Sequence, residues 1–322
     1  VLTIDFNLDG INILPDILVA VCMGLAFFYF AKTAKIKKTF PVICFTLYTA
    51  ATLFEDFIRY YFAENYYYNA IEKDGKEYLS GSLKPNYYRA LTDNDIDYLN
   101  FVPPLIPFHP LYHWRRATNM LKTKATLIHR YSHTAYIETT VSVMGMKDVL
   151  MTYTVYPDGK IDVTHKGTPA MDMVRFGSML TMAREFDKVK WYGRGPHENY
   201  IDRNHSADIG LYKTSIDELF VPYLKPQEHG ERTGIRRAKL SGINEVSFEA
   251  DTEMEINVCP WTSFQLEDAP HTHELPESDK LYFRAVARQM GVGGYDSWGC
   301  HTLTEHKNLS GKEYKFGFSI IV

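Results

Sequence analysis

The clearest structural signal in the chain is the stretch Thr152-Tyr153-Thr154-Val155-Tyr156-Pro157-Asp158-Gly159-Lys160-Ile161-Asp162-Val163-Thr164-His165. Its central pair, Asp158-Gly159, is typical of a tight hairpin turn, because both residue types tolerate the left-handed backbone that such turns require. The runs on either side, Thr152–Tyr156 and Lys160–His165, alternate in character as half-buried strands do. The stretch therefore predicts an antiparallel β-hairpin.

Similar turn signals and candidate strands recur along most of the chain. Asp74-Gly75 is a second hairpin dipeptide. Further candidate strands are Ile137–Val143, Val189–Tyr192, Val246–Ala250, Glu253–Val258, Leu281–Ala287 and Tyr314–Val322. Helical periodicity is scarce, and Tyr98–Trp114 contains four prolines, so we expect an irregular loop there. Many short strands with regular turns predict a mainly β protein with a large antiparallel sandwich over residues 67–322.

The composition excludes some classes of function. The 322 residues carry a formal net charge of −4, which gives no electrostatic case for nucleic acid as a partner. The four cysteines, Cys22, Cys44, Cys259 and Cys300, have no C-x-x-C spacing. Neither a disulfide framework nor a zinc site is indicated by them.

Residues 1–66 differ from everything that follows. Ile11–Ala31 and Phe40–Phe54 are largely apolar runs, separated by a connector with four lysines. Their lengths are at or just under the roughly 20 residues that a membrane helix needs. No basic segment precedes the first run, so a signal peptide fits poorly. We expect a short helical hairpin that either spans a membrane through residues 11–62 or is buried in a soluble protein.

A glycine-rich stretch, Gln289-Met290-Gly291-Val292-Gly293-Gly294-Tyr295-Asp296-Ser297-Trp298-Gly299, lies near the end of the chain. Its four glycines favour a tight turn with positive φ angles. A turn of this kind can present the flat ring of Trp298 to a ligand that arrives from outside. The alternative is a β-turn whose tryptophan folds back into its own core.

Other candidate sites each have a structural alternative. Asp93, Asn94 and Asp95 offer oxygen ligands for a cation, but an Asx-rich turn that caps backbone amides fits better, with Arg89 as the ion-pair partner of one carboxylate. His197 and Glu198 form a possible acid–base pair, or a hydrogen-bonded corner after a strand.

Two histidines, His271 and His273, precede Glu274 and suggest a metal site. Two histidines at this spacing, without a third ligand at a fixed distance, are weak evidence for metal binding. We therefore predict no metal ligands in this chain.

Four of these stretches together resemble the C-terminal domain of glycoside hydrolase family 2 β-galactosidases. The family has an aromatic-Arg-Ala-x-x-Asp-Asn-Asp segment, a Trp-x-Gly-x-Gly-Pro-x-Glu-Asn-Tyr-x-Asp-Arg strand, a Pro-x-x-x-Pro-Gln-Glu-x-Gly turn and a Met-Gly-x-Gly-Gly-x-Asp-Ser-Trp loop. The matching stretches here are Tyr88–Asp95, Trp191–Arg203, Pro222–Gly230 and Met290–Trp298. They occur in the family's order, and the resemblance extends over roughly residues 67–322.

The resemblance implies a β-supersandwich similar to galactose mutarotases. In the family, the paired catalytic glutamates of a retaining mechanism and the magnesium ligands lie on a TIM barrel upstream. We therefore expect no catalytic residue and no cofactor in this chain, and a barrel-bearing large subunit or upstream domain as its partner. By motif match, Trp298 stacks on the galactoside, and Gly291, Gly293, Gly294, Asp296 and Ser297 shape its loop. Tyr295 departs from the family, which often has an acidic residue there.

The resemblance leaves two functions open. The chain is either the accessory part of a β-galactosidase, or a stand-alone carbohydrate-binding or mutarotase-like sandwich. Residues 1–66 replace strands that family small subunits carry, so this segment is either a true membrane anchor or of foreign origin. The family context implies a cytoplasmic location, whereas a genuine hairpin implies anchorage to a membrane.

Overall fold

The computed structural model describes residues 2–4, 71–73, 76–79, 81, 83–100, 110–131, 133–294 and 302–322. The chain divides into two units, of which one comprises Val1–Asp5 with Tyr68–Val322 and the other Phe6–Tyr67. The second unit lies wholly outside the described residues. The expected helical hairpin and its membrane span therefore remain predictions, although Leu2–Ile4 form a strand, β1. No described helix has both the length and the apolar character needed to cross a membrane.

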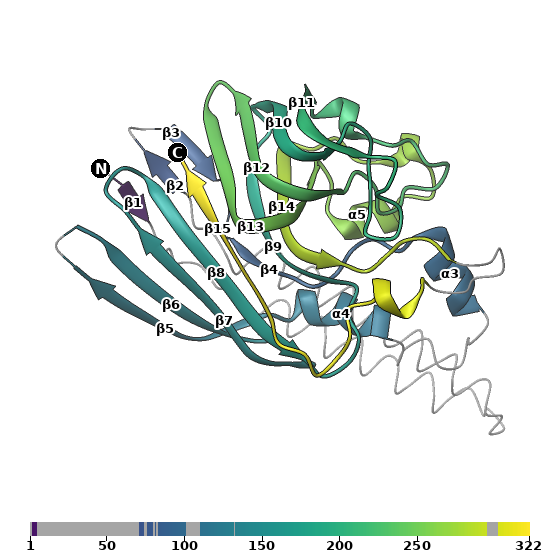
Figure 1. Cartoon of the computed structure of the whole chain (residues 1–322), viewed down its shortest axis with the longest axis horizontal. Coiled ribbons are helices and arrows are strands. Elements are labelled where there is room, and N and C mark those ends of the chain that lie inside the picture. The colour runs from purple at the N-terminus through teal and green to yellow at the C-terminus, as the bar shows by residue number, and fades with distance from the viewer. Residues whose placement is uncertain are drawn as a thin grey trace, which may run out of the picture. The chain divides into compact units, whose positions relative to one another are not determined.

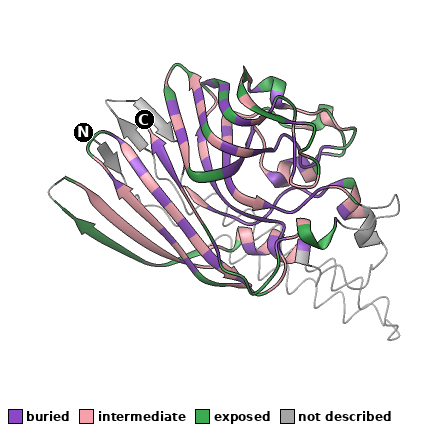
Figure 2. Ribbon diagram, viewed as in Figure 1, coloured by how far each residue is buried: buried purple, intermediate pink, exposed green. Residues whose placement is uncertain are grey.

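The hairpin predicted around Asp158-Gly159 is confirmed. Strands β7 (Met146–Val155) and β8 (Lys160–Pro169) pair in antiparallel register, with Val155 opposite Ile161. Gly159 has a φ of 95°, in the left-handed region that favours glycine. Along β8, buried residues alternate with half-buried ones, as expected of a strand with one face on a core (Figure 2).

Antiparallel pairing extends through every described strand pair. The prediction of a mainly β, antiparallel fold is therefore confirmed. The remaining strands are β2 (Ile71–Lys73), β3 (Lys76–Leu79), β4 (Lys84–Asn86), β5 (Lys122–Arg130), β6 (Ala135–Ser142), β9 (Arg175–Ala183), β10 (Phe186–Gly195), β11 (Asp208–Ser215), β12 (Arg232–Gly242), β13 (Glu245–Cys259), β14 (Lys280–Gln289) and β15 (Tyr314–Ile321).

Three branches of a 12-stranded sheet meet at the long strand β13, of which one leads through β12 and β10 to β11 (Figure 1). Its first part, Ser247–Ala250, pairs with β15, which continues through β8, β7 and β6 to β5. Its second part, Glu255–Cys259, pairs with β14, which leads through β9 to β4. One strand thus pairs with β15 along its first part and with β14 along its second, whereas the sequence predicts two separate strands there.

The largest hydrophobic cluster includes buried residues of β13 and packs against this strand. Phe248 of β13 and Phe283 of β14 are fully buried, and their rings stack with centroids 3.8 Å apart. Burial of each such side chain contributes about 1.5–3 kcal/mol to stability. This aromatic pair therefore helps to hold β13 and β14 together.

Helices occupy part of the region expected to be irregular. Helix α3 (Asp93–Asn100) and helix α4 (Pro110–Asn119) overlap both ends of Tyr98–Trp114, so that prediction is wrong there. Proline is compatible with the first position of a helix, where its missing N–H would have had no partner. Trp114 of α4 is buried and donates its indole N–H to the carbonyl oxygen of Asp172 over 2.7 Å. Helix α5 (Ser263–Asp268) and the 3₁₀ helices η2 (Asp217–Leu219), η3 (Thr272–Glu274) and η4 (Thr304–His306) complete the described elements.

Candidate functional site

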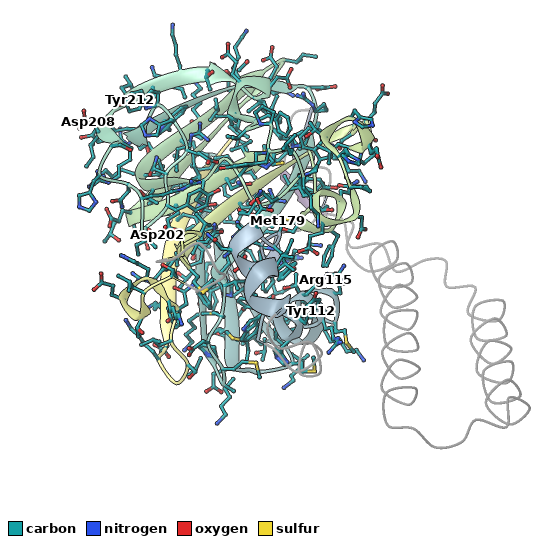
Figure 3. The ribbon with its side chains drawn as sticks, turned by 90° about the vertical axis from the view of Figure 1, so that its right-hand side faces the viewer. Tyr112, Arg115, Met179, Asp202, Asp208 and Tyr212 are labelled. Carbon is teal, nitrogen blue, oxygen red and sulfur yellow. The ribbon has the colours of Figure 1, made fainter. Side chains whose placement is uncertain are left out.

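The first half of the glycine-rich stretch leaves the end of β14 and is held by a carboxylate from a distant motif. Asp202, labelled in Figure 3, lies in the turn region that follows β10. Its Oδ2 accepts a hydrogen bond from the backbone N–H of Gly293 over 2.8 Å and from the hydroxyl of Thr302 over 3.2 Å. A single carboxylate oxygen therefore holds residues from both sides of the segment 295–301.

The glycine at position 291 is required by this close approach. A Cβ atom added to Gly291 would lie 2.5 Å from Asp202 Oδ2 and 2.6 Å from Thr302 Oγ1, closer than real Cβ atoms come. Neither Gly291 nor Gly293 has a φ in the left-handed region. The expected use of positive φ is therefore wrong at these two positions, where space rather than backbone conformation limits the residue type.

A second motif holds the same stretch from another side. Asn94, in the first turn of α3, donates its side-chain amide to the carbonyl oxygen of Val292 over 3.0 Å. The N–H of Met290 donates to the carbonyl oxygen of Val174 over 2.8 Å. Residues 290–293 are thus fixed through both backbone and side-chain partners that come from separate parts of the chain.

The contacts of His197 and Glu198 do not support the interpretation of these residues as an acid–base pair. Glu198 accepts hydrogen bonds from the N–H of Gly230 and the hydroxyl of Tyr223, both over 2.7 Å, and from Arg203 over 2.6 Å. His197 instead contacts Ser206 over 3.0 Å. The hydrogen-bonded corner is therefore the better interpretation, and Glu198 joins the second motif to the third.

The Asx-rich turn at Asp93–Asp95 is likewise structural. Asp95 accepts a hydrogen bond from the N–H of Thr92 over 2.9 Å and pairs with buried Arg89 over 2.6 Å, which confirms the predicted ion-pair partner. Gln227 and Asp93 bond reciprocally: the Gln227 amide donates to Asp93 Oδ2 over 2.9 Å, and the Asp93 N–H donates to Gln227 Oε1 over 3.2 Å.

The four motifs form a closed ring, which we call the motif ring. Its links are Asp93 to Gln227, Gly230 to Glu198, Asp202 to Gly293, and Val292 to Asn94. Sequence spacing did not predict these contacts, because partners such as Asn94 and Val292 are 198 residues apart. The motif ring therefore makes the four stretches a single structural unit.

Comparison with known proteins identifies the family. The family model described as "Beta galactosidase small chain" matches residues 62–320. The chain belongs to this family.

Curated relatives agree with the match. A β-galactosidase from Priestia megaterium is 32% identical over 254 residues, which cover 76% of this chain and 24% of that protein. One from Streptococcus thermophilus is 32% identical over 255 residues, which cover 77% of this chain and 24% of that protein. The chain thus spans about a quarter of the length of these relatives.

Solved structures resemble the chain at a low level. A galactose mutarotase related enzyme from Lactobacillus acidophilus overlaps 79% of this chain and 89% of its own, with a TM-score of 0.40 and 9% identity. A galactose 1-epimerase from the same species gives a TM-score of 0.40 with 10% identity, over 79% of this chain and 88% of its own. Similarity at this level does not indicate the activity of this chain.

In this β-galactosidase small-chain domain, one buried arginine contacts two stretches of the motif ring. Arg175, the first residue of β9, donates to the side-chain oxygen of Gln289 over 2.6 Å, and so holds the strand end from which the loop leaves. It also pairs with Glu228 and donates to the carbonyl oxygen of Tyr88 over 3.2 Å. Arg175 thus ties two of the four motifs to the base of the loop, and no motif signal in the sequence pointed to it.

The pKa values of two neighbouring buried carboxyl groups are shifted in opposite directions. Burial alone would raise the pKa of Glu228, but the guanidinium groups around it, with Arg175 foremost, lower that pKa below its usual value. At Glu231 burial dominates and raises the pKa well above the usual range, against the effect of Arg175. Arg175 contacts both groups, but its guanidinium lies closer to Glu228 than to Glu231, so its effect outweighs burial at Glu228 and not at Glu231.

Of the predicted site residues, the structure places Gly291, Gly293 and Gly294 at the start of the loop, after β14. Trp298, Asp296 and Ser297 lie outside the described residues, so their roles in sugar stacking and loop shaping remain predictions. Asp202, Asn94 and Arg175 were not among the predicted site residues. Asp202 and Asn94 belong to the matched motifs, and that membership was the available signal.

Proposed function

We propose that this chain is the small-chain portion of a β-galactosidase and hydrolyses terminal β-galactosides only together with a barrel-bearing partner. Membership of the small-chain family supports this function, as does the chain's extent of about a quarter of its relatives. The catalytic glutamates would lie on the remaining three quarters. The observation that carries the proposal is the motif ring, because it holds residues 290–293, which lead into the segment containing Trp298.

The physical role of the ring is pre-organisation. A loop that contributes one ring to a sugar site is most effective when its conformation is fixed before the sugar binds, because ordering it on binding costs conformational entropy. Four linked motifs around Gly291–Gly294 fulfil that requirement. The proposed contribution of Trp298 is an apolar face for the galactoside ring.

Magnesium is expected on the partner rather than here. Mg²⁺ prefers near-octahedral oxygen ligands and keeps several waters. Asp95 and Glu228 in the ring region are already engaged by guanidinium groups, and Asp93 by the Gln227 amide. These carboxylates do not fit a magnesium site, and no step of the proposed function passes through one.

Complementation tests the proposal. The relative from Priestia megaterium, truncated to remove the segment that matches this chain, would be mixed with the full chain and assayed on a chromogenic aryl β-galactoside. We expect hydrolysis by the mixture and none by either component alone. Trp298→Ala should lower kcat/KM by at least about tenfold, while Asp208→Ala on exposed β11 should leave it unchanged.

The contrary outcomes are specific. A mixture that forms a complex but gains no hydrolysis would overturn the proposal. Galactose binding by the chain alone, with no effect on the truncated relative, would favour a stand-alone carbohydrate-binding sandwich. A cytoplasmic location is part of the proposal, and recovery of the natural protein in the membrane fraction would support the anchor predicted through residues 11–62.

A further inference from the structure

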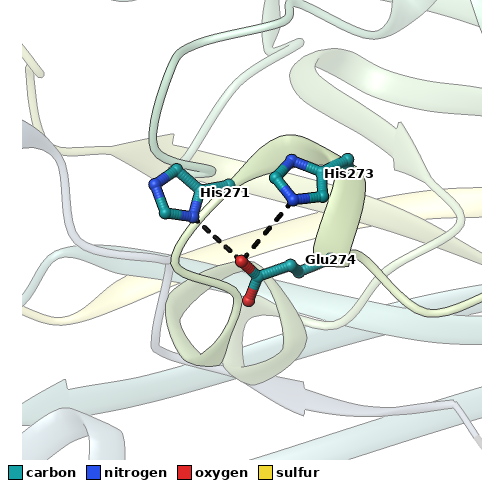
Figure 4. Close-up of side chains that lie close together, drawn as sticks. All are labelled: His271, His273 and Glu274. Atoms are coloured by element: carbon teal, nitrogen blue, oxygen red, sulfur yellow. Dashed lines mark hydrogen bonds and ion pairs between the residues drawn. The ribbon is translucent and has the colours of Figure 1, made fainter.

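A compact group of metal-binding side chains lies outside the motif ring. His271, His273 and Glu274 are exposed and converge at the short helix η3 (Figure 4). Glu274 Oε1 lies 2.9 Å from His271 Nδ1 and 3.7 Å from His273 Nε2. One donor atom from each residue lies within 4.8 Å of the other two. Glu274 thus places one carboxylate beside both histidines.

The backbone beneath the group is fixed. The N–H of Glu274 donates to the carbonyl oxygen of His271 over 3.0 Å, which closes the turn. The hydroxyl of Thr272 donates to the carbonyl oxygen of Tyr223 over 2.8 Å and so attaches the turn to a neighbouring segment. The two imidazole rings lie nearly parallel, at 20° and with centroids 5.5 Å apart. Both rings are therefore already on the same side of the turn as the carboxylate.

We propose that His271, His273 and Glu274 form a surface site for a borderline transition-metal dication such as Zn²⁺. Zinc binds imidazole nitrogen and carboxylate oxygen at about 2.0–2.2 Å in tetrahedral geometry, which places neighbouring donors about 3.4 Å apart. The observed separations of 2.9 and 3.7 Å bracket this value. The donor atoms of the two histidines lie within 4.8 Å of each other, and in the proposed site rotation of these exposed side chains brings all three donors to the tetrahedral spacing. Because the three residues are exposed, the fourth coordination position is open to solvent.

The donor set also selects among metals. Imidazole nitrogen favours zinc, nickel and copper, whereas magnesium and calcium prefer sites made wholly of oxygen. A simple ion pair would need one histidine beside Glu274, but two approach the same carboxylate oxygen. This convergence distinguishes the group from an ordinary surface histidine–glutamate pair.

Calorimetric titration of the full chain, prepared without a histidine tag, tests the site. ZnCl₂ should bind with one ion per chain at the highest-affinity step, and MgCl₂ should give no binding. His273→Ala and Glu274→Gln should each weaken zinc binding by at least about tenfold, because loss of an outer partner alone already costs 10–100-fold. His205→Ala provides the control, since this histidine is exposed and lies outside the group.

The site is refuted if the wild-type chain binds no zinc, or if His273→Ala and Glu274→Gln bind zinc as tightly as the control His205→Ala. Because all three ligands are exposed, their replacement should leave the circular dichroism spectrum and thermal midpoint unchanged, and a loss of zinc binding then reports a loss of ligands. None of the three belongs to the motif ring, so this test is independent of β-galactoside hydrolysis.

Discussion

At the scale of single residues, burial decides the chemistry of the carboxyl groups around the loop. Glu255 of β13 accepts a hydrogen bond from the N–H of Gln289 over 2.8 Å, at the strand end from which the glycine-rich stretch begins. Burial raises its pKa to about 7, against the lowering effect of that hydrogen bond. Below a pH of about 7, the folded protein therefore favours the protonated form of this buried carboxyl group.

This elevated pKa predicts how stability depends on pH. Between the ordinary glutamate pKa of 4.5 and the folded value of about 7, the unfolded chain releases a proton that the folded chain retains. Stability from this group is therefore fully present at low pH, falls as pH rises through that window, and stays low above it. The maximum effect is roughly 3 kcal/mol, from 1.36 kcal/mol per pKa unit.

Glu255→Gln should therefore raise the free energy of unfolding at pH 8 relative to the wild type, because the amide keeps an acceptor for Gln289 without the buried charge. The difference should disappear near pH 4. Urea unfolding at several pH values measures it, with Glu249→Gln on the exposed part of β13 as control. An equal change in stability at both pH values would contradict the burial argument.

At the scale of elements, the start of α3 depends on one buried ion pair. Arg89 and Asp95 are both buried, with guanidinium and carboxylate 2.6 Å apart, and the same carboxylate caps the N–H of Thr92. Removal of one partner from a buried pair leaves an uncompensated charge, which costs about 3–5 kcal/mol. The pair thus fixes the position of Asn94 in the first turn of the helix.

Arg89→Met should lower the free energy of unfolding by about 3–5 kcal/mol. Arg237→Met, which breaks the exposed pair with Glu249 on β12 and β13, should change it by at most about 1 kcal/mol. Equilibrium denaturation of the two variants gives the comparison. Similar small losses in both would show that the buried pair does not hold the helix.

The elements were predictable wherever local chemistry decides them. Asp158-Gly159 predicted the β7–β8 hairpin because the turn itself requires a left-handed residue. Tyr314–Val322 predicted β15 to within one residue. The prediction of two strands, Val246–Ala250 and Glu253–Val258, was wrong because pairing on both sides of residues 251–252 keeps β13 continuous. Prolines concealed α4, although Pro110 begins it.

The candidate site was predictable only as separate motifs. The ring joins residues as far apart as Asn94 and Val292, and no local pattern encodes such contacts. Arg175 was not found because it lies in a strand that no turn signal marked. The spacing of His271, His273 and Glu274 likewise does not determine that their donor atoms converge, because this depends on how the turn at η3 folds.

At the scale of the whole molecule, strands and loops from distant parts of the chain hold residues 290–293 in place. The 12-stranded sheet brings the four motifs together, and the motif ring holds the described half of the loop. The chain spans about a quarter of the length of its relatives. The central claim is therefore that the ring, through Asp202, keeps the loop ready for a galactoside.

The most direct test is the kcat/KM of the complemented enzyme with Asp202→Ala. This change removes the acceptor of the Gly293 N–H, so the loop should lose its fixed conformation. We expect kcat/KM on an aryl β-galactoside to fall by at least about tenfold, with complex formation unchanged, while Asp208→Ala keeps full activity. Full activity in Asp202→Ala, with the complex intact, would contradict the account.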